Sequence, residues 1–489
     1  MDVLKEAAVW LKKRIGMPLT AVLYLLFFSA YTSPLFPKYM NQDSAIFMMV
    51  GKGMNQGKQL YLDVFDHKGP ILFWIEALGM RFGRNGIFLI QCIFLTVDIW
   101  FMLKIAGYFC CGRKVYLAVA AGLIWLAYPL ANGNLSEEYS LPFILGIFYF
   151  FLKDWMDARN PKMRHSYLYG ICFGVLFFIR ANNAVTICAL ILGWMYILIK
   201  RRQIGALFQH LLAGAAGIAT IALPVCIYFW TQGSLREMFY ATFLFNLQYS
   251  GRAGLIAGFT NPVTLFRMGI LFLPILTAAI VFFNEMEDQE LKVIMGLVVG
   301  LNFCSLFLGH GYNHYFTIIL PIVVLLFSLM PLEKGGEKKK GKWRRDLEKG
   351  LAGVVFAGYC VLALRIIGSN FYDYYIDKAV LNEYDAVHEK FSQIPVDERD
   401  RVLGYEIPAK YYLMGDVLPC YKYGILQYHW EQSNKQIMID FLAYVREESP
   451  LWLVSEKDTN NMELKTILLE SYQLIWEDDY AEYYHLTDQ

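Results

Sequence analysis

Long apolar segments alternate with short polar ones along the first three quarters of the chain. A helix needs about 20 mostly apolar residues to cross roughly 30 Å of hydrocarbon. About eleven segments meet that requirement. They cover residues 17–36, 86–108, 115–132, 139–153, 166–181, 184–200, 208–230, 266–284, 292–309, 315–332 and 350–368. We therefore predict a polytopic α-helical membrane protein whose transmembrane domain occupies residues 1–368.

The pattern changes after residue 368, where no further long apolar segment occurs. Short runs rich in β-branched and aromatic residues predict strands at 401–405, 451–454 and 472–476. Helical periodicity predicts helices at 374–392, 433–447 and 461–471. Residues 369–489 are thus expected to form a small soluble C-terminal α/β domain.

Basic residues gather in alternate loops, which sets the expected orientation. The clusters lie at 12–14, 113–114, 153–164, 200–202 and 338–345. Short loops rich in Lys and Arg stay in the cytoplasm, and acidic residues count little in this rule, so the acidic loop 284–292 does not alter the assignment. The first long loop, 37–84, and the C-terminal domain are then predicted to lie on the extracytoplasmic side of the cell membrane.

Composition agrees with a bilayer environment. The 489 residues are 57% hydrophobic and 18% charged, against about 25% charged in soluble domains. A net charge of +1 gives no reason to expect a nucleic-acid partner. The nine cysteines lie mostly in apolar segments and show neither a disulfide framework nor zinc-type spacing.

The first outer loop begins with an acidic residue close to the membrane surface. Asp43 follows the first apolar segment by about seven residues, where a carboxylate is costly unless it is solvated, paired or used. Such a group could act as a general base on an acceptor hydroxyl. The alternative is that Asp43 is the N-cap of the amphipathic segment 44–55.

A second polar cluster, 63–68, precedes Gly69 and Pro70 in the same loop. Lys68 is a compact cation suited to a phosphate at the headgroup level. Asp66 and His67 could pair with Lys68, hold a divalent metal or position a substrate, and Asp63 could also contact the substrate. The alternative is a turn with helix-start chemistry, because Asp and Pro both favour helix N-termini.

Three further groups lie at the predicted outer ends of later spans. They are the acidic pair Glu137 and Glu138, Arg180, and the His314 and Tyr315 pair. Arg180 could hold a phosphate through two parallel hydrogen bonds, the others could contact a substrate, and His314 is a third candidate metal ligand. The alternatives are complementation of a helix dipole for the acids, snorkelling for Arg180, and an interfacial aromatic belt for the last pair.

Taken in this order, the motifs resemble the GT-C superfamily of polytopic glycosyltransferases, in particular its protein O-mannosyltransferase-like and aminoarabinosyltransferase-like branch. The resemblance rests on Asp43, the segment 57–70, the Glu137 and Glu138 turn, Arg180, and the His314 and Tyr315 pair ahead of Pro321. One departure is Lys-Gly-Pro at 68–70, where the branch commonly has Lys-Pro-Pro.

The resemblance implies a sugar donor carried on a polyprenyl phosphate within the bilayer and a glycan, lipid or protein acceptor. By this analogy Asp43 would be the general base, while Lys68 and Arg180 would neutralise the donor phosphate. Asp66, His67, Glu138 and His314 would shape the substrate site. No cofactor is implied beyond the possible divalent metal, and the sequence contains no phosphate-binding loop for a nucleotide donor.

Two other functions remain open at this point. A transporter or flippase of lipid-linked sugars would carry ionisable or broken helices near the bilayer midplane, whereas the acids here gather in outer loops. A surface-polysaccharide ligase or polymerase would place its main catalytic loop late in the chain.

Overall fold

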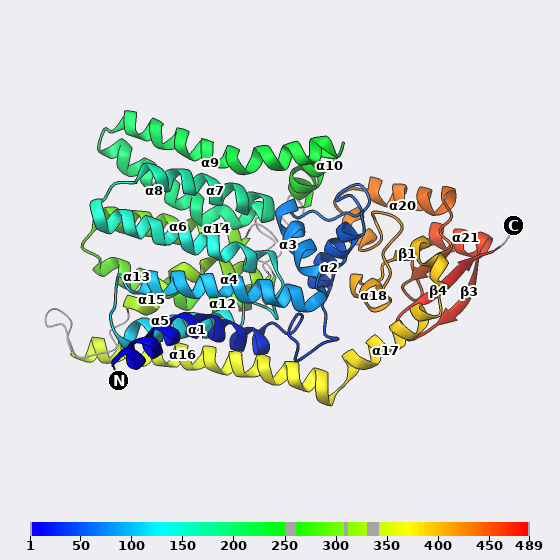
Figure 1. The fold of residues 1–489 in the computed structure, drawn as a ribbon, viewed down its shortest axis with the longest axis horizontal. Helices are drawn as coiled ribbons and strands as arrows, with labels where there is room; N and C mark the ends of the chain where they lie inside the picture. Colours follow the sequence, from blue (N-terminus) through cyan, green and yellow to red (C-terminus); the bar gives the residue numbers. More distant parts are fainter. Residues whose placement is uncertain (1, 250–260, 308–311, 330–341, 488–489) are drawn as a thin grey trace. The chain divides into compact units, whose positions relative to one another are not determined.

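The computed structural model describes residues 2–249, 261–307, 312–329 and 342–487. The chain is mostly helical (Figure 1) and divides into two compact units. Unit 1 comprises Met1–Ser29, Leu89–Val225 and Ala253–Ser369, and unit 2 comprises Ala30–Phe88, Cys226–Arg252 and Asn370–Gln489. Unit 2 therefore contains both the first loop and the C-terminal residues, whereas the sequence analysis divides the chain once, at residue 368.

Unit 1 is built from long helices, several of which run side by side in Figure 1. They are α1 (Asp2–Phe28), α4 (Gly83–Ala106), α5 (Arg113–Leu126), α6 (Ser136–Ala158), α7 (Met163–Arg180), α8 (Val185–Lys200), α9 (Ile204–Thr231), α12 (Pro262–Leu271), α13 (Leu273–Glu285), α14 (Gln289–Phe307), α15 (Leu320–Leu329) and α16 (Lys342–Phe371). The short 3₁₀ helices η1 (Ala181–Ala184) and η3 (Asn313–Ile319) precede α8 and α15. Helix α8 packs against α14, α5 against α15, and α6 against α7.

Each predicted span falls on one of these helices or on a consecutive pair. Among the described residues, five helical segments are long and apolar enough to cross a membrane. They are Gly83–Ala106, Met163–Lys200, Ile204–Thr231, Gln289–Leu306 and Gly353–Ile376. The fold is thus that of a helical membrane protein, while the number of eleven spans stays a prediction. The basic residues at 338–340 lie outside the described part.

Some span boundaries differ from the prediction for a local reason. The apolar run 17–36 is helical only to Phe28. Pro34 and Pro37 lie in the non-helical remainder, where each disfavours helical geometry in the residue before it. The run 266–284 divides into α12 and α13 beside Pro274, which lacks the N–H that a continuous helix would use.

Unit 2 contains shorter helices around the first loop and in the C-terminal part. They are α2 (Gln42–Asn55), α3 (Pro70–Met80), α10 (Leu235–Phe239), α17 (Ala379–Ser392), α18 (Ala409–Met414), α19 (Gln427–Glu431), α20 (Gln436–Glu447) and α21 (Met462–Ser471), with the π-helical turns η2 (Tyr240–Leu244) and η4 (Tyr372–Ile376) and the 3₁₀ turn η5 (Val396–Arg401). Helix α2 packs closely on α3 at Gly51, which has no Cβ. A Cβ there would lie only 2.7 Å from the backbone carbon of Glu76.

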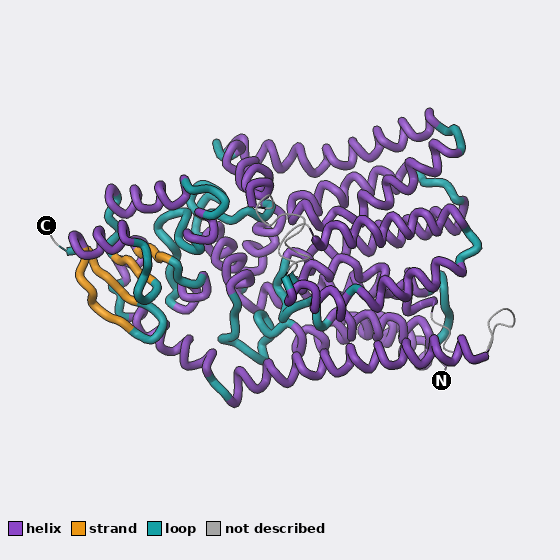
Figure 2. Tube along the Cα trace, turned by 180° about the vertical axis from the view of Figure 1, so that it is seen from behind, coloured by secondary structure: helices purple, strands orange, loops and turns teal. Residues whose placement is uncertain are grey.

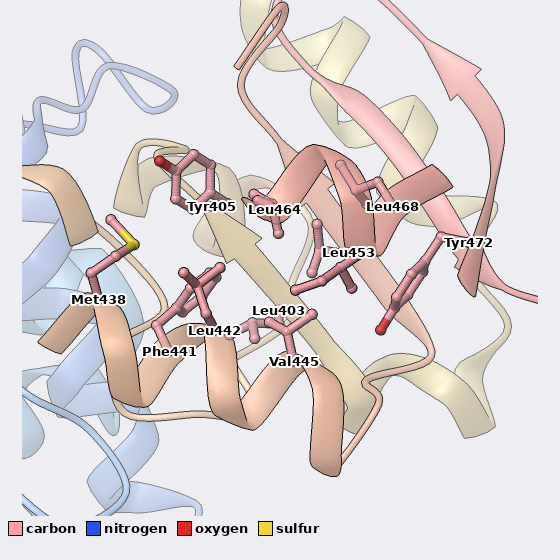
Figure 3. Packing of buried hydrophobic residues seen from close by; sticks show 11 residues of the cluster. Leu403, Tyr405, Met438, Phe441, Leu442, Val445, Leu453, Leu464, Leu468 and Tyr472 are labelled. Carbon is pink, nitrogen blue, oxygen red and sulfur yellow. The ribbon is translucent and has the colours of Figure 1, made fainter. Parts of the chain in front are cut away.

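A four-stranded sheet lies in the C-terminal part of unit 2 (Figure 2). Its strands β1 (Val402–Tyr405), β2 (Trp452–Ser455), β4 (Glu482–Leu486) and β3 (Tyr472–Glu477) occur in that order, with β1 and β2 parallel and the other pairs antiparallel. Figure 3 shows Phe441, Leu442 and Val445 of α20 packed toward Leu403 and Leu453 of the first two strands. Three strands overlap predicted stretches, and β4 was not predicted.

Candidate active site

The first loop presents Asp43 at the start of a capped helix. The side chain of Asn41 is the N-cap of α2, and its Oδ1 accepts a hydrogen bond of 2.9 Å from the Ser44 N–H. The alternative prediction that Asp43 is the N-cap is therefore wrong. Asp43 occupies the first helical turn, where the helix dipole favours a negative charge, and it is half-buried. The carboxylate of Asp43 is therefore not the capping group of α2.

The segment that leads into α2 is fixed by Arg84, a residue that the sequence analysis did not single out. Its guanidinium donates hydrogen bonds of 2.5–2.9 Å to the backbone carbonyls of Ala30, Tyr31, Phe36 and Tyr39. An arginine has five N–H donors in a rigid fork, so a single side chain can hold four carbonyls at once. Arg84 therefore holds the segment that directly precedes α2.

Asp66 and Lys68 form the centre of the loop before α3. Asp66 is 2% exposed, and its Oδ1 accepts a hydrogen bond of 2.8 Å from the Lys68 N–H. The Lys68 ammonium lies 4.0 Å from the same oxygen and 3.0 Å from Nε2 of His67. The Tyr61 hydroxyl donates to the Lys68 carbonyl at 2.7 Å. The backbone of Lys68 is therefore held on both sides.

Electrostatics connect this centre to Asp43. Burial raises the pKa of Asp66 above its ordinary value of 3.8, and this outweighs the opposing effects of the Lys68 charge and N–H. The negative charge of Asp43 raises the Asp66 pKa further. Asp66 therefore interacts electrostatically with both Lys68 and Asp43.

His67 is held by residues from a distant part of the chain. Asn246 donates a hydrogen bond of 2.7 Å to the His67 carbonyl, and the rings of Phe245 and Tyr249 lie 5.8 and 5.3 Å from the imidazole. The sequence analysis missed Asn246, because no local pattern links this asparagine to a residue 179 positions away along the chain.

Asp63, in contrast, makes a local contact. It is exposed, and its Oδ2 accepts a hydrogen bond of 2.7 Å from the Gln59 N–H, which closes the turn 59–63. A role of Asp63 in substrate binding stays a prediction.

In unit 1, Glu137, Arg180, His314 and Tyr315 come together. Glu137 is 1% exposed; its Oε1 pairs with the Arg180 guanidinium, and its Oε2 accepts a hydrogen bond of 3.0 Å from the Ser136 hydroxyl. The guanidinium lies 4.2 Å from the centre of the Tyr315 ring, which in turn lies 4.8 Å from the His314 ring. Arg180 is therefore oriented by a carboxylate and an aromatic face.

Glu138 has different partners although it follows Glu137 directly. Its Oε2 accepts hydrogen bonds from the Gln91 side chain at 2.8 Å and from the Asn134 N–H at 2.9 Å. It is 4% exposed and thus belongs to the interface between α4 and α6. A substrate-binding role for Glu138 stays a prediction.

The metal prediction has no geometric support in the described part of the chain. There, no three His, Cys, Asp or Glu side chains lie close enough together to hold a metal ion, whether near Asp66, His67 or His314. The arrangement instead supplies carboxylates and cations suited to proton transfer and to charge neutralisation.

The architecture is that of a GT-C glycosyltransferase fold. ArnT from Cupriavidus metallidurans, in a structure with undecaprenyl phosphate bound, matches with a TM-score of 0.62 and 11% identity over 98% of this chain and 100% of ArnT. The oligosaccharyltransferase from Archaeoglobus fulgidus, tethered to an acceptor peptide, matches with a TM-score of 0.52 and 12% identity over 98% of this chain and 75% of that protein. The predicted GT-C fold is thereby confirmed.

The sequence also matches one described protein family. Residues 5–365 match the family described as Putative competence-induced protein Ccs4 N-terminal domain, and the chain belongs to that family. No curated protein matches the sequence.

Proposed function

We propose that the protein is a membrane glycosyltransferase that moves a sugar from a polyprenyl-phosphate donor to a glycan, lipid or protein acceptor on the extracytoplasmic face of the cell membrane. The observation that carries the proposal is the grouping of Asp43, Asp66 and Lys68 in the first loop of a chain with a GT-C fold. The ArnT structure with undecaprenyl phosphate supports the donor class.

Asp43 is the proposed general base. A glycosyl phosphate is already activated, so the enzyme must remove a proton from the acceptor, neutralise the departing phosphate and exclude bulk water. A half-buried carboxylate at a fixed helix start, with its capping role taken by Asn41, suits the first task.

Lys68 is the proposed cation for the donor phosphate. Its backbone is locked by Asp66 and Tyr61, so its ammonium needs little reorganisation when a phosphate arrives. The nearby Asp66, whose Oδ1 lies 4.0 Å from the ammonium, is buried, and burial raises its pKa above the ordinary value. His67, beside the ammonium, is proposed to help position the donor.

Arg180 is proposed as a second phosphate-binding cation in unit 1, and Glu137 and Tyr315 fix its orientation. His314 and Glu138 are proposed to contribute to substrate binding in the same unit, and Asp63 to do so in unit 2.

The test is sugar transfer in membranes that contain the full-length protein. A panel of radiolabelled polyprenyl-phosphate sugars is offered together with cell-envelope acceptors, and wild type is compared with Asp43→Asn. The matched control is Asp416→Asn, which removes an exposed acid that pairs with Lys52 at the far end of α2. A positioned base contributes about 10²–10⁴-fold to a rate, so a loss of that size is expected for Asp43→Asn alone.

The other outcomes separate the alternatives. Full transfer by a folded Asp43→Asn protein would place the base elsewhere. Absence of transfer from every donor by wild type would favour the transporter or flippase, which is then tested by movement of a labelled polyprenyl-linked sugar across a vesicle membrane.

A further inference from the structure

Three ring side chains follow one another from the Lys68 ammonium within unit 2. Nε2 of His67 lies 3.0 Å from that ammonium, and the Tyr249 ring lies 5.3 Å from the His67 ring. The ring of His429 lies 5.5 Å from the Tyr249 ring. We call these three side chains the ring row. All three are half-buried, so each keeps part of its surface open to solvent. The ring row therefore begins at the proposed phosphate-binding cation and ends in the C-terminal part of the chain.

The place of His429 beside the first loop is fixed by buried aromatic packing. The next residue of α19, Trp430, is 1% exposed, and its ring lies 5.1 Å from the ring of Phe65. The buried ring of Tyr423 lies 5.2 Å from the same phenylalanine. Phe65 precedes Lys68 by three residues. The loop that carries the ammonium and the helix that carries His429 thus share one aromatic core, and close packing leaves little freedom between them.

A buried amide fixes α19 from its other end. Gln427 is 0% exposed, and its Nε2 donates hydrogen bonds of 2.7 Å to the carbonyls of Gly404 and Tyr423. Its Oε1 accepts a hydrogen bond of 2.9 Å from the Glu406 N–H. A helix of five residues has little stability of its own, so these contacts decide where α19 presents His429. Such a support is typical of a side chain held ready for a ligand.

The chemistry of the ring row suits a carbohydrate. A pyranose has apolar C–H faces, which pack against an aromatic face such as that of Tyr249. Its rim carries hydroxyl groups, and each imidazole offers one donor and one acceptor nitrogen when it is neutral. An apolar surface with a few fixed polar groups is the usual composition of a small-molecule site. An acyl chain would use the tyrosine face and leave the ring nitrogens without partners.

We propose that Tyr249 and His429 bind the acceptor of the transfer reaction, and that this acceptor is a carbohydrate. The inference rests on the proposed function, because it takes Lys68 as the cation for the donor phosphate. A sugar ring of the acceptor stacks on Tyr249, and His429 forms a hydrogen bond with one of its hydroxyl groups. His67 lies between this acceptor subsite and the Lys68 ammonium. His429 is thus a specificity-determining residue contributed by the C-terminal part of the chain.

The first experiment measures sugar transfer by the full-length protein in membranes, with oligosaccharides released from a cell envelope as acceptors. For His429→Ala we expect the KM for the acceptor to rise roughly 3- to 10-fold, the effect of one lost hydrogen bond, and the KM for the donor to stay unchanged. His429→Gln retains a hydrogen-bonding group and should recover part of the loss. The matched control is Tyr428→Ala, which changes the neighbouring, exposed residue of α19 and should leave both KM values at the wild-type level.

A second experiment needs neither a variant nor transfer. Diethyl pyrocarbonate modifies accessible imidazoles, and mass spectrometry measures the modified fraction of each histidine in the wild-type protein. The same oligosaccharides should reduce modification of His429 several-fold and leave His388 of α17, which is also half-buried, unaffected. If wild type transfers no sugar from any donor, the proposed function fails, and the protection of His429 still decides whether a carbohydrate binds there.

Three results would overturn the proposal. One is equal modification of His429 with and without the oligosaccharides. Another is a wild-type KM for the acceptor in a folded His429→Ala protein. The third is protection of His429 by a peptide or a lipid acceptor at concentrations where the oligosaccharides give none, which would assign the ring row to a different class of acceptor.

Discussion

The ion pair between Glu137 and Arg180 offers a direct test of how unit 1 is held together. Their side chains are 1% and 16% exposed, so both charges are largely removed from water. Glu137→Gln keeps the size of the side chain but leaves the guanidinium without its carboxylate. Removal of one partner from a buried pair costs about 3–5 kcal/mol, because the remaining charge is buried and uncompensated. We expect the free energy of unfolding to fall by an amount in that range.

A double-mutant cycle separates the pair from its surroundings. Arg180→Met alone leaves a buried carboxylate, whereas the combination with Glu137→Gln leaves no charge at all. We therefore expect the loss of unfolding free energy in the double variant to be smaller than the sum of the two single losses by about 0.5–3 kcal/mol. The matched control is Glu138→Gln, since Glu138 accepts neutral hydrogen bonds that a glutamine oxygen can also accept. Its cost should be smaller.

The measurement is denaturant- or heat-induced unfolding of the purified protein in detergent, followed by tryptophan fluorescence. Equal losses in Glu137→Gln and Glu138→Gln would refute the reasoning, because they would mean that the charge of Arg180 does not need its partner. Strict additivity in the cycle would refute it as well.

Three further predictions concern unit 2. Arg84→Lys should lower the free energy of unfolding by at least about 1.5 kcal/mol, because three ammonium donors cannot serve four carbonyls, and this is measured by thermal unfolding in detergent. Asn41→Ala should cost about 1 kcal/mol and also lower sugar transfer, whereas Asn41→Ser should retain both. Asp66 has a folded-state pKa above 3.8, so its contribution to stability is fully present below 3.8 and is lost as the pH rises through the raised value. The melting temperature of wild type should therefore fall relative to that of Asp66→Asn as the pH rises through that interval.

Specific results would contradict these three predictions. An Arg84→Lys protein as stable as wild type would mean that water replaces the lost carbonyl contacts. Unchanged transfer in Asn41→Ala would mean that the cap does not position Asp43. A pH-independent difference between wild type and Asp66→Asn would mean that Asp66 is not held in its buried environment.

The helical framework could be predicted because hydrophobic length is a strong signal. Apolar runs of span length have few alternatives to a helix, since backbone groups in hydrocarbon must bond within the segment. The boundaries were weaker where local chemistry competes with hydropathy. The run that ends at Phe36 remains apolar past Phe28, yet the helix ends there, and the carbonyls of Ala30, Tyr31 and Phe36 bond to the distant Arg84. Strand β4 was missed because its buried Tyr483 lies among polar neighbours and gains its pairing from distant Val454.

The first-loop residues could be selected from the sequence, but their partners could not. Acids and a lysine concentrated within a short stretch indicate chemistry when they lie in a loop of a membrane protein. Arg84 and Asn246 act through backbone carbonyls that lie 45–54 and 179 residues away along the chain. No local pattern encodes such contacts, because they depend on how the chain returns to the loop.

The neighbouring acids Glu137 and Glu138 illustrate why type and position in the sequence do not suffice to assign roles. Successive residues of a helix point in directions about 100° apart, so two adjacent side chains at a helix start face different elements. Glu137 meets Arg180 and Ser136, whereas Glu138 meets Gln91 of α4. Glu137 therefore neutralises the charge of Arg180, whereas Glu138 joins α6 to α4 through Gln91. If Arg180 binds the donor phosphate, substitution of Glu137 should change donor affinity, and substitution of Glu138 should change it only through stability.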